Sequence, residues 1–226
     1  MTETPLIIIG AGNSTGEIID IINDINVVSN KKIKVIGILD DNKKLLNKKL
    51  NNAPIIGKPK DATKFKKEKF FLGIFSYKNR FARYRLIKSL MKLKSKFINI
   101  IHPSSLIGQK TKLGFGCLIS NNCNIYSNSN VSNFCTLSPN VSLAPFSKVK
   151  DNCFIGNGSL VSSGATVEKS SYLGFRSSIL ENIKVSEGSR IMPNSIVTKN
   201  VTRKNSIIFG SPSKIIGFEN KKILTG

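Results

Sequence analysis

The residues best placed to hold a ligand stand near the N-terminus, in the segment GAGNSTGEI. Gly10, Gly12 and Gly16 follow a short apolar run and precede an amphipathic stretch, which is the order of a strand, a tight turn and a helix. Glycines let a phosphate approach the amides at the start of such a helix. Asp40 and Asp41 end the next predicted strand, where a carboxylate can accept hydrogen bonds from a sugar or a base. The pattern favours ligand binding over plain strand-to-helix packing, which also uses such glycines.

Four cysteines and a single histidine could serve as metal ligands or nucleophiles. Cys117, Cys135 and Cys153 are each eighteen residues apart, but no histidine accompanies them at a metal-ligand spacing. A buried thiol behaves as a small hydrophobe, so we expect reduced cysteines that fill the core and no metal site. The histidine, His102, lies where the first half of the chain passes into the second. We expect it to be a structural, hydrogen-bonded residue.

A repeat fills the second half of the chain. From Ile101 onward, every sixth residue is Ile, Leu or Val for seventeen positions without a slip. Chance does not produce such a run, so it predicts a repeating fold. The repeat positions are Ile101, Ile107, Leu113, Ile119, Ile125, Val131, Leu137, Leu143, Val149, Ile155, Val161, Val167, Leu173, Ile179, Val185, Ile191 and Val197.

Mostly small side chains stand four residues after each of these aliphatics, as at Ser105, Cys117 and Ala165. Gly, Asn and Ser between them supply turns. Short strands that each turn one bulky and one small residue inward would wind into a parallel β-solenoid around a continuous apolar column.

The first hundred residues read instead as alternating strands and helices, including a strand over 69–77 and a helix over 79–93. We therefore expect an α/β domain over 1–98, a solenoid over 99–204 and a C-terminal tail over 205–226.

The formal net charge of +22 is spread over both halves of the chain, and there is no Trp. This favours a Lys- and Asn-rich solvated surface over a nucleic-acid partner, although such a surface would still attract polyphosphates such as nucleotide sugars or coenzyme A. No apolar stretch approaches the roughly 18 residues of a membrane-spanning helix. Without a signal-like start, we expect a cytoplasmic protein.

In this order the parts resemble the NeuD/PglD-like family of sugar O- or N-acetyltransferases, through GAGNSTGEI, ILDDN, IIHPSSLIG, SPNVSLAPFSKV and FGSPSK. The resemblance covers nearly the entire chain. It implies a Rossmann-like N-terminal domain that binds a nucleotide sugar, followed by a left-handed parallel β-helix with three hexapeptide repeats to a turn. It also implies acetyl-CoA as a co-substrate, held in a groove between the subunits of a homotrimer.

The resemblance also assigns site residues. Those expected to contact the acceptor nucleotide are Gly10, Gly12, Ser14, Asp40 and Asp41. Those expected near the coenzyme are Thr136, Gly156, Gly174, Pro212 and Lys214.

One departure concerns the family's general base, a His followed by an acidic residue. Aligning the family pattern puts Ser127 in the place of that His and Asn128 in the place of the acid. Thr136 stands for a second family His, and Ser14 stands where many relatives carry a His in the glycine-rich turn. Since the proton-accepting pair is missing, we expect Ser127 and Asn128 to orient the acceptor rather than deprotonate it.

A missing base is tolerable for an amine acceptor and severe for a hydroxyl. An amine near electron-withdrawing oxygens resembles an α-amino group of pKa about 7.7–8.0, so roughly a tenth of it is neutral at pH 7. A hydroxyl ionises near the pKa of water, about 15.7. We therefore expect acetylation of an amino group on a nucleotide-linked amino sugar, in surface-polysaccharide assembly. A catalytically silent relative that binds nucleotide sugar or a partner enzyme, and transfer of another acyl group, stay open as alternatives.

Overall fold

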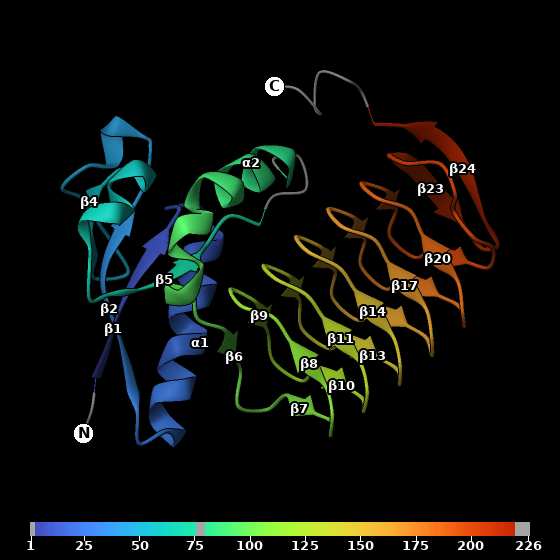
Figure 1. Ribbon diagram of the computed structural model, residues 1–226, viewed down its shortest axis with the longest axis horizontal. Coiled ribbons are helices and arrows are strands. Elements are labelled where there is room, and N and C mark those ends of the chain that lie inside the picture. The colour runs from blue at the N-terminus through green and yellow to red at the C-terminus, as the bar shows by residue number, and fades with distance from the viewer. Residues whose placement is uncertain (1–2, 76–79, 220–226) are drawn as a thin grey trace.

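The computed structural model describes residues 3–75 and 80–219, and it places an α/β domain against one end of a long parallel β-helix (Figure 1). The helix predicted over 79–93 is present as α2 (Arg80–Leu90) and η4 (Met91–Lys96). Of the strand predicted over 69–77, β5 (Lys69–Leu72) is formed, and positions 76–77 lie outside the described residues.

The α/β domain is built on a five-stranded sheet in the order β3-β4-β2-β1-β5. Its central strand, β1 (Glu3–Ile9), runs parallel to β2 (Lys32–Leu39) and to β5. β4 (Ala53–Gly57) pairs parallel with β2, and β3 (Lys49–Leu50) is antiparallel at the edge. The short helices η1 (Lys43–Leu45) and η2 (Pro59–Lys64) lie in the connections between strands.

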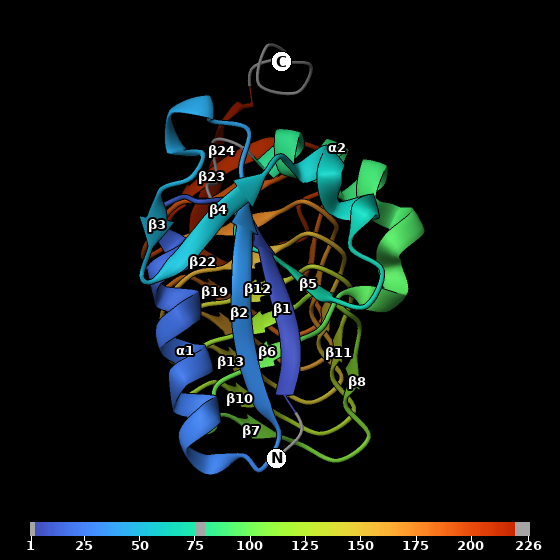
Figure 2. The ribbon, with the colours of Figure 1, turned by 90° about the vertical axis from the view of Figure 1, so that its left-hand side faces the viewer.

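The apolar residues of β1 alternate between two cores, because successive strand side chains point to opposite faces. Leu6 and Ile8 pack with α1 (Ser14–Val28), while Ile7 and Ile9 pack on the other face with Leu90 of α2. Figure 2 shows α1 and α2 flanking the sheet, with the β-helix behind it. Helix α1 is thus the layer between the sheet and the first coils.

The β-helix has three parallel sheets, and each complete coil supplies one two-residue strand to each of them. Sheet I contains β7 (Leu106–Ile107), β10 (Asn124–Ile125), β13 (Ser142–Leu143), β16 (Leu160–Val161), β19 (Ser178–Ile179) and β22 (Ile196–Val197). Sheet II contains β8 (Lys112–Leu113), β11 (Asn130–Val131), β14 (Lys148–Val149), β17 (Thr166–Val167) and β20 (Lys184–Val185). Sheet III contains β6 (Ile100–Ile101), β9 (Leu118–Ile119), β12 (Thr136–Leu137), β15 (Phe154–Ile155), β18 (Tyr172–Leu173) and β21 (Arg190–Ile191).

Two further strands continue sheet III within the predicted tail. β23 (Ser206–Gly210) pairs parallel with β21, and β24 (Ser213–Phe218) folds back antiparallel on β23. The hairpin covers the far end of the apolar column, where Ile208 is only 1% exposed. The sequence alone did not indicate that these residues extend the sheet.

The predicted aliphatic column is confirmed. From Ile119 to Val197, every repeat aliphatic is at most 1% exposed. Burial of each such side chain stabilises the fold by about 1.5–3 kcal/mol. The first coil is less covered, and Ile107 is 39% exposed because no coil lies beneath it.

The corners between strands have a second six-residue register. Every sixth residue from Lys110 to Asn194 has a φ between +54° and +69°. This left-handed conformation costs most L-residues about 1–2 kcal/mol, whereas Gly adopts it freely and Asn tolerates it. Asn or Gly fills most of these positions, so the corners account for much of the Asn content of this half of the chain.

A left-handed corner can be tested at Asn194, an exposed residue with a φ of +57°. We expect Asn194→Val to lower the free energy of unfolding by about 1–2 kcal/mol, and Asn194→Gly to leave it nearly unchanged, because only the β-branched side chain clashes there. Urea unfolding measures both. The control is Asn130→Val in the extended strand β11, where valine should cost little; equal losses from both valines would contradict the corner explanation.

Candidate active site between the two domains

The glycine-rich turn and the first acidic residue after β2 meet at the carboxyl end of the sheet. The Ala11 amide donates to Asp40 Oδ2 at 2.7 Å, and the Asn42 amide donates to Asp40 Oδ1 at 2.8 Å. Asp40 therefore holds the turn in place, while Asp41 is exposed beside it. Gly10 has a φ of +108°, and a Cβ there would lie 2.6 Å from Ile74. A Cβ on Gly12 would meet open space, so the turn leaves room for a ligand.

A cavity of about 410 Å³ opens where the start of α1 faces sheet III and the corner that follows it. Ser14 and Glu17 line it from α1, and Thr136 lines it from β12. The remaining lining residues are mostly apolar or uncharged: Phe75, Leu118, Ser138, Pro139, Phe154, Asn157 and Phe175. The fold thus brings Ser14, which is expected to contact the acceptor, into the same cavity as Thr136, which is expected near the coenzyme.

A second cavity, of about 450 Å³, continues along the same face of α1. Its α1 wall carries Glu17, Asp20 and Asp24, and its coil wall includes His102 and Asn122. Glu17 lines both cavities. The two together form one cleft between the domains.

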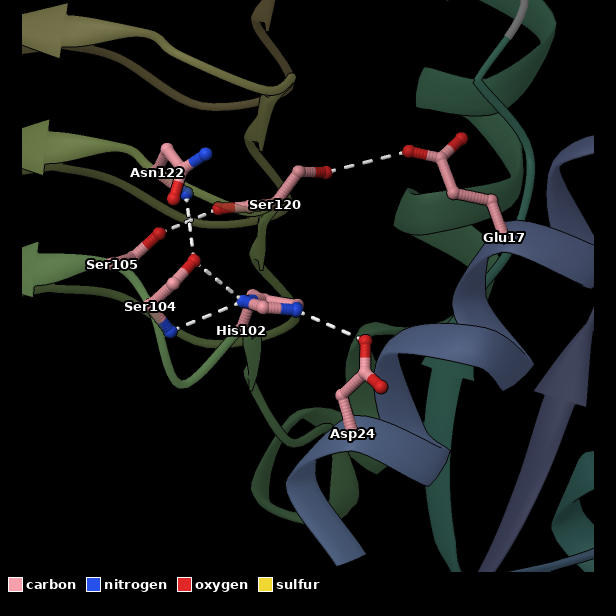
Figure 3. Close-up of polar contacts among 7 residues, drawn as sticks. All are labelled: Glu17, Asp24, His102, Ser104, Ser105, Ser120 and Asn122. Carbon is pink, nitrogen blue, oxygen red and sulfur yellow. Dashed lines mark hydrogen bonds and ion pairs between the residues drawn. The ribbon is translucent and has the colours of Figure 1, made fainter. Parts of the chain in front are cut away.

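His102 fastens the walls of this cleft together (Figure 3). Its Nε2 lies 3.0 Å from Asp24 Oδ2 on α1, and its Nδ1 accepts from the Ser104 amide at 3.1 Å. Both ring nitrogens are engaged, which confirms the expected hydrogen-bonded role. The His102 ring therefore links the first coil of the β-helix to helix α1.

Ser127 and Asn128 lie at another corner, between sheets I and II, and neither lines the 410 Å³ cavity. Asn128 is one of the left-handed corner residues, with a φ of +61°. Its amide donates to the Gln109 carbonyl of the preceding coil at 3.1 Å. The backbone alone gives a reason for asparagine here. Within one chain, Ser127 and Asn128 therefore lie on a different side of the β-helix from Thr136, which lines the cavity together with Ser14.

The predicted coenzyme-side glycines, Gly156 and Gly174, are not among the residues that line the 410 Å³ cavity, although each directly precedes a lining residue, Asn157 or Phe175. A Cβ on either glycine would approach the backbone of the next coil to 2.7 Å or less, so close coil stacking also requires them. Pro212 and Lys214 are exposed on the β23–β24 hairpin and are absent from the cavity lining.

Sequence reasoning missed Glu17, Phe154 and Phe175. Glu17 could have been found, because it follows Ser14 by one helical turn and so shares its face of α1. The aromatic residues carry no such signal. Phe154 is simply the outward residue of its strand, and Phe175 lies in a corner.

The cysteines fill the small inward positions as predicted, and all four are buried. Burial raises the pKa of Cys123 to about 11 and that of Cys153 to about 12. Arg83 of α2 lies beside their stack, where burial lowers its pKa to about 10, and its Nη1 donates to Asn152. Within residues 3–75 and 80–219, no three His, Cys, Asp or Glu side chains group as a metal site. No helix in these ranges is long and apolar enough to cross a membrane.

Two family models match consecutive parts of the chain. Residues 5–87 match the PglD N-terminal domain, and residues 97–208 match the GMPPB C-terminal domain. A search of curated protein sequences found no match.

Solved structures resemble the chain over nearly its whole length. A variant of perosamine N-acetyltransferase from Caulobacter crescentus, in complex with CoA and GDP-perosamine, has a TM-score of 0.81 at 17% identity, covering 94% of this chain and 97% of that one. The acetyltransferase domain of PglB from Neisseria gonorrhoeae, with acetyl coenzyme A, has a TM-score of 0.81 at 15% identity, covering 95% and 100%. WeeI from Acinetobacter baumannii has a TM-score of 0.79 at 18% identity, covering 95% and 100%.

The resemblance to the NeuD/PglD-like family is confirmed. So is the fold expected from it, an α/β domain followed by a left-handed parallel β-helix. At these identities the solved structures show the fold.

The thiol pKa values predict how stability depends on pH. Between about pH 9 and pH 11 the thiol of Cys153 ionises in the unfolded state and stays neutral in the folded state. The free energy of unfolding therefore falls as the pH rises through this range. Each such thiol contributes a slope of about 1.4 kcal/mol per pH unit. Urea unfolding from pH 8 to 11 should therefore show a shallower alkaline decline for Cys153→Ala than for the native protein. Parallel curves would contradict the burial of a neutral thiol.

Proposed function

We propose that this chain is an acyl-CoA-dependent acetyltransferase that acts on an amino group of a nucleotide-linked amino sugar. The observation that carries the proposal is the interdomain cavity, in which the start of α1, with Ser14, faces Thr136 of the coil. The glycine-rich turn would hold the nucleotide, and the coil would present the thioester. The bound CoA and GDP-perosamine of the Caulobacter neighbour support this pair of substrates.

The lining of the cavity suits this role. Phe75, Phe154 and Phe175 offer apolar surface that excludes water from a thioester. The net charge of +22 would draw in two polyphosphate ligands. Positioning alone supplies much of the rate when an already nucleophilic amine attacks, and a coil amide would stabilise the oxyanion.

Ser127 and Asn128 enter the proposal through a second copy of the chain. Their turn is flanked by exposed apolar side chains, with Tyr126 52% and Phe146 59% exposed. Leu160 and Leu180 extend this apolar surface along the coils. A homotrimer packed through it would cover the surface and bring Ser127 and Asn128 near a neighbour's cavity. Pro212 and Lys214 would then approach the coenzyme from the end of the coils.

The absence of a His–acid pair at these two positions favours one other candidate, a silent relative that binds nucleotide sugar or a partner enzyme. Such a protein would bind the nucleotide sugar and release no thiol from acetyl-CoA. The paired variant Ser127→His with Asn128→Glu would then restore turnover only if the rest of the site is intact.

The enzymatic proposal predicts thiol release from acetyl-CoA with GDP-perosamine, faster than with its hydroxyl counterpart. We expect Ser14→Trp, which fills the cavity, to lower kcat/KM at least a hundredfold without lowering Tm. The matched control is Asn23→Trp, exposed on the same helix and outside the cavity lining, which should keep native turnover. Faster turnover of the hydroxyl compound, or equal rates for the two tryptophan variants, would overturn the assignment.

The oligomer is tested separately. Phe146→Glu places a charge in the apolar surface and should convert the trimer to monomers, because a buried unpaired carboxylate is strongly unfavourable. Light scattering coupled to gel filtration measures the mass. Lys112→Glu, on sheet II, is the control and should stay trimeric. A native protein that is monomeric at micromolar concentration would contradict the trimer.

A further inference from the structure

We propose that the Glu17 carboxylate binds the acceptor's amino group and receives its proton as the new bond forms. This inference rests on the proposed function and adds a catalytic residue to it. It supplies what Ser127 and Asn128 lack, a proton acceptor, from a different part of the chain.

The position of Glu17 is the first argument. It is exposed, lines the cavity that unites Ser14 with Thr136, and is the one ionisable side chain in that lining among the described residues. Figure 3 shows its carboxylate reaching from α1 toward the coil, where Ser120 Oγ donates to Oε1 at 3.5 Å. Ser120 is buried and would steer one oxygen, leaving the other free to accept from a ligand.

Helix geometry explains why a carboxylate stands there. Positions 14 and 17 are one turn apart, so both side chains meet the cavity beside the glycine-rich turn. An acidic residue in the first turn is also favoured by the positive end of the helix dipole. The next acidic residues on this face, Asp20 and Asp24, line only the neighbouring cavity.

The competing proton acceptors of the cleft are less suitable. Ser14, Thr136 and Ser138 carry hydroxyls, which are poor bases near neutral pH. His102 is committed to Asp24 and Ser104 and lies in the adjoining cavity. Glu17 is therefore the group that combines charge, a free oxygen and access to the cavity.

The proposed step balances without a further reactant. The nitrogen lone pair of the neutral amine attacks the thioester carbonyl carbon, a C–N bond forms, and the carbonyl electrons move onto oxygen. The nitrogen becomes positively charged and acidic, and Glu17 takes its proton. Collapse of the oxyanion breaks the C–S bond and expels the coenzyme A thiolate, which is protonated by Glu17 or by solvent. The products are an amide and a free thiol.

The test compares Glu17→Gln with the native protein in the thiol-release assay with acetyl-CoA and GDP-perosamine. Glutamine keeps the size and the bond from Ser120 but cannot accept a proton. We expect kcat/KM to fall by about 10²–10⁴-fold, the usual contribution of a positioned base. Glu3→Gln makes the same change at an exposed glutamate at the start of β1, outside both cavities, so it is the matched control and should stay within twofold. A fall of less than threefold for Glu17→Gln would overturn the proposal.

A binding measurement separates this inference from the proposed function. If the native protein releases no thiol, the proposed acetyltransferase fails, but calorimetry with GDP-perosamine and its hydroxyl counterpart still tests Glu17. We then expect the native protein to bind the amine at least threefold more tightly, and Glu17→Gln to lose that preference. Equal native affinities for the two compounds would show that Glu17 does not read the amino group.

Discussion

The whole molecule depends on a six-residue repeat that determines both which side chains point into the core and where the chain turns. Every sixth residue is an inward aliphatic, and three residues later the chain turns through a left-handed corner. With two-residue strands, the residue before each inward aliphatic must point outward. Leu118, Thr136 and Phe154 are such outward neighbours on sheet III, and all three line the interdomain cavity. The packing of the core therefore fixes the spacing of the site.

The register matters for the site only because the α/β domain is docked firmly against the first coils. Phe134 at one corner packs edge-on against Phe97, with ring centroids 5.0 Å apart, and against Phe115 at 5.3 Å. On the other side, α1 shares a core with Ile100 and Leu118. Two apolar contacts on opposite sides hold the domain, and His102 adds a polar one. The cavity walls are thus set before any ligand binds.

A local sequence pattern predicts a structural repeat when the repeated positions share one residue type. It does not predict a repeat of backbone conformation when several residue types adopt that conformation. The aliphatic column could be predicted, because its members share one chemical property. The corner register could not, because Lys110, Phe134 and Phe146 occupy the same conformation as its asparagines and glycines. The meeting of Ser14 with Thr136 depends on how the two domains dock, and no local pattern encodes docking. Asn128, which the family resemblance expects to orient the acceptor, also occupies one of these left-handed corners.

Charge acts on two length scales in this protein. The excess of 35 basic over 13 acidic residues makes a long-range field that attracts any polyphosphate but cannot distinguish one sugar from another. Within a few ångströms, individual side chains dominate, and α1 presents carboxylates to the cleft. An acceptor with an anionic nucleotide at one end and a cationic amine at the other suits both scales. The field would draw in the nucleotide, and Glu17 would orient the amine toward the coil.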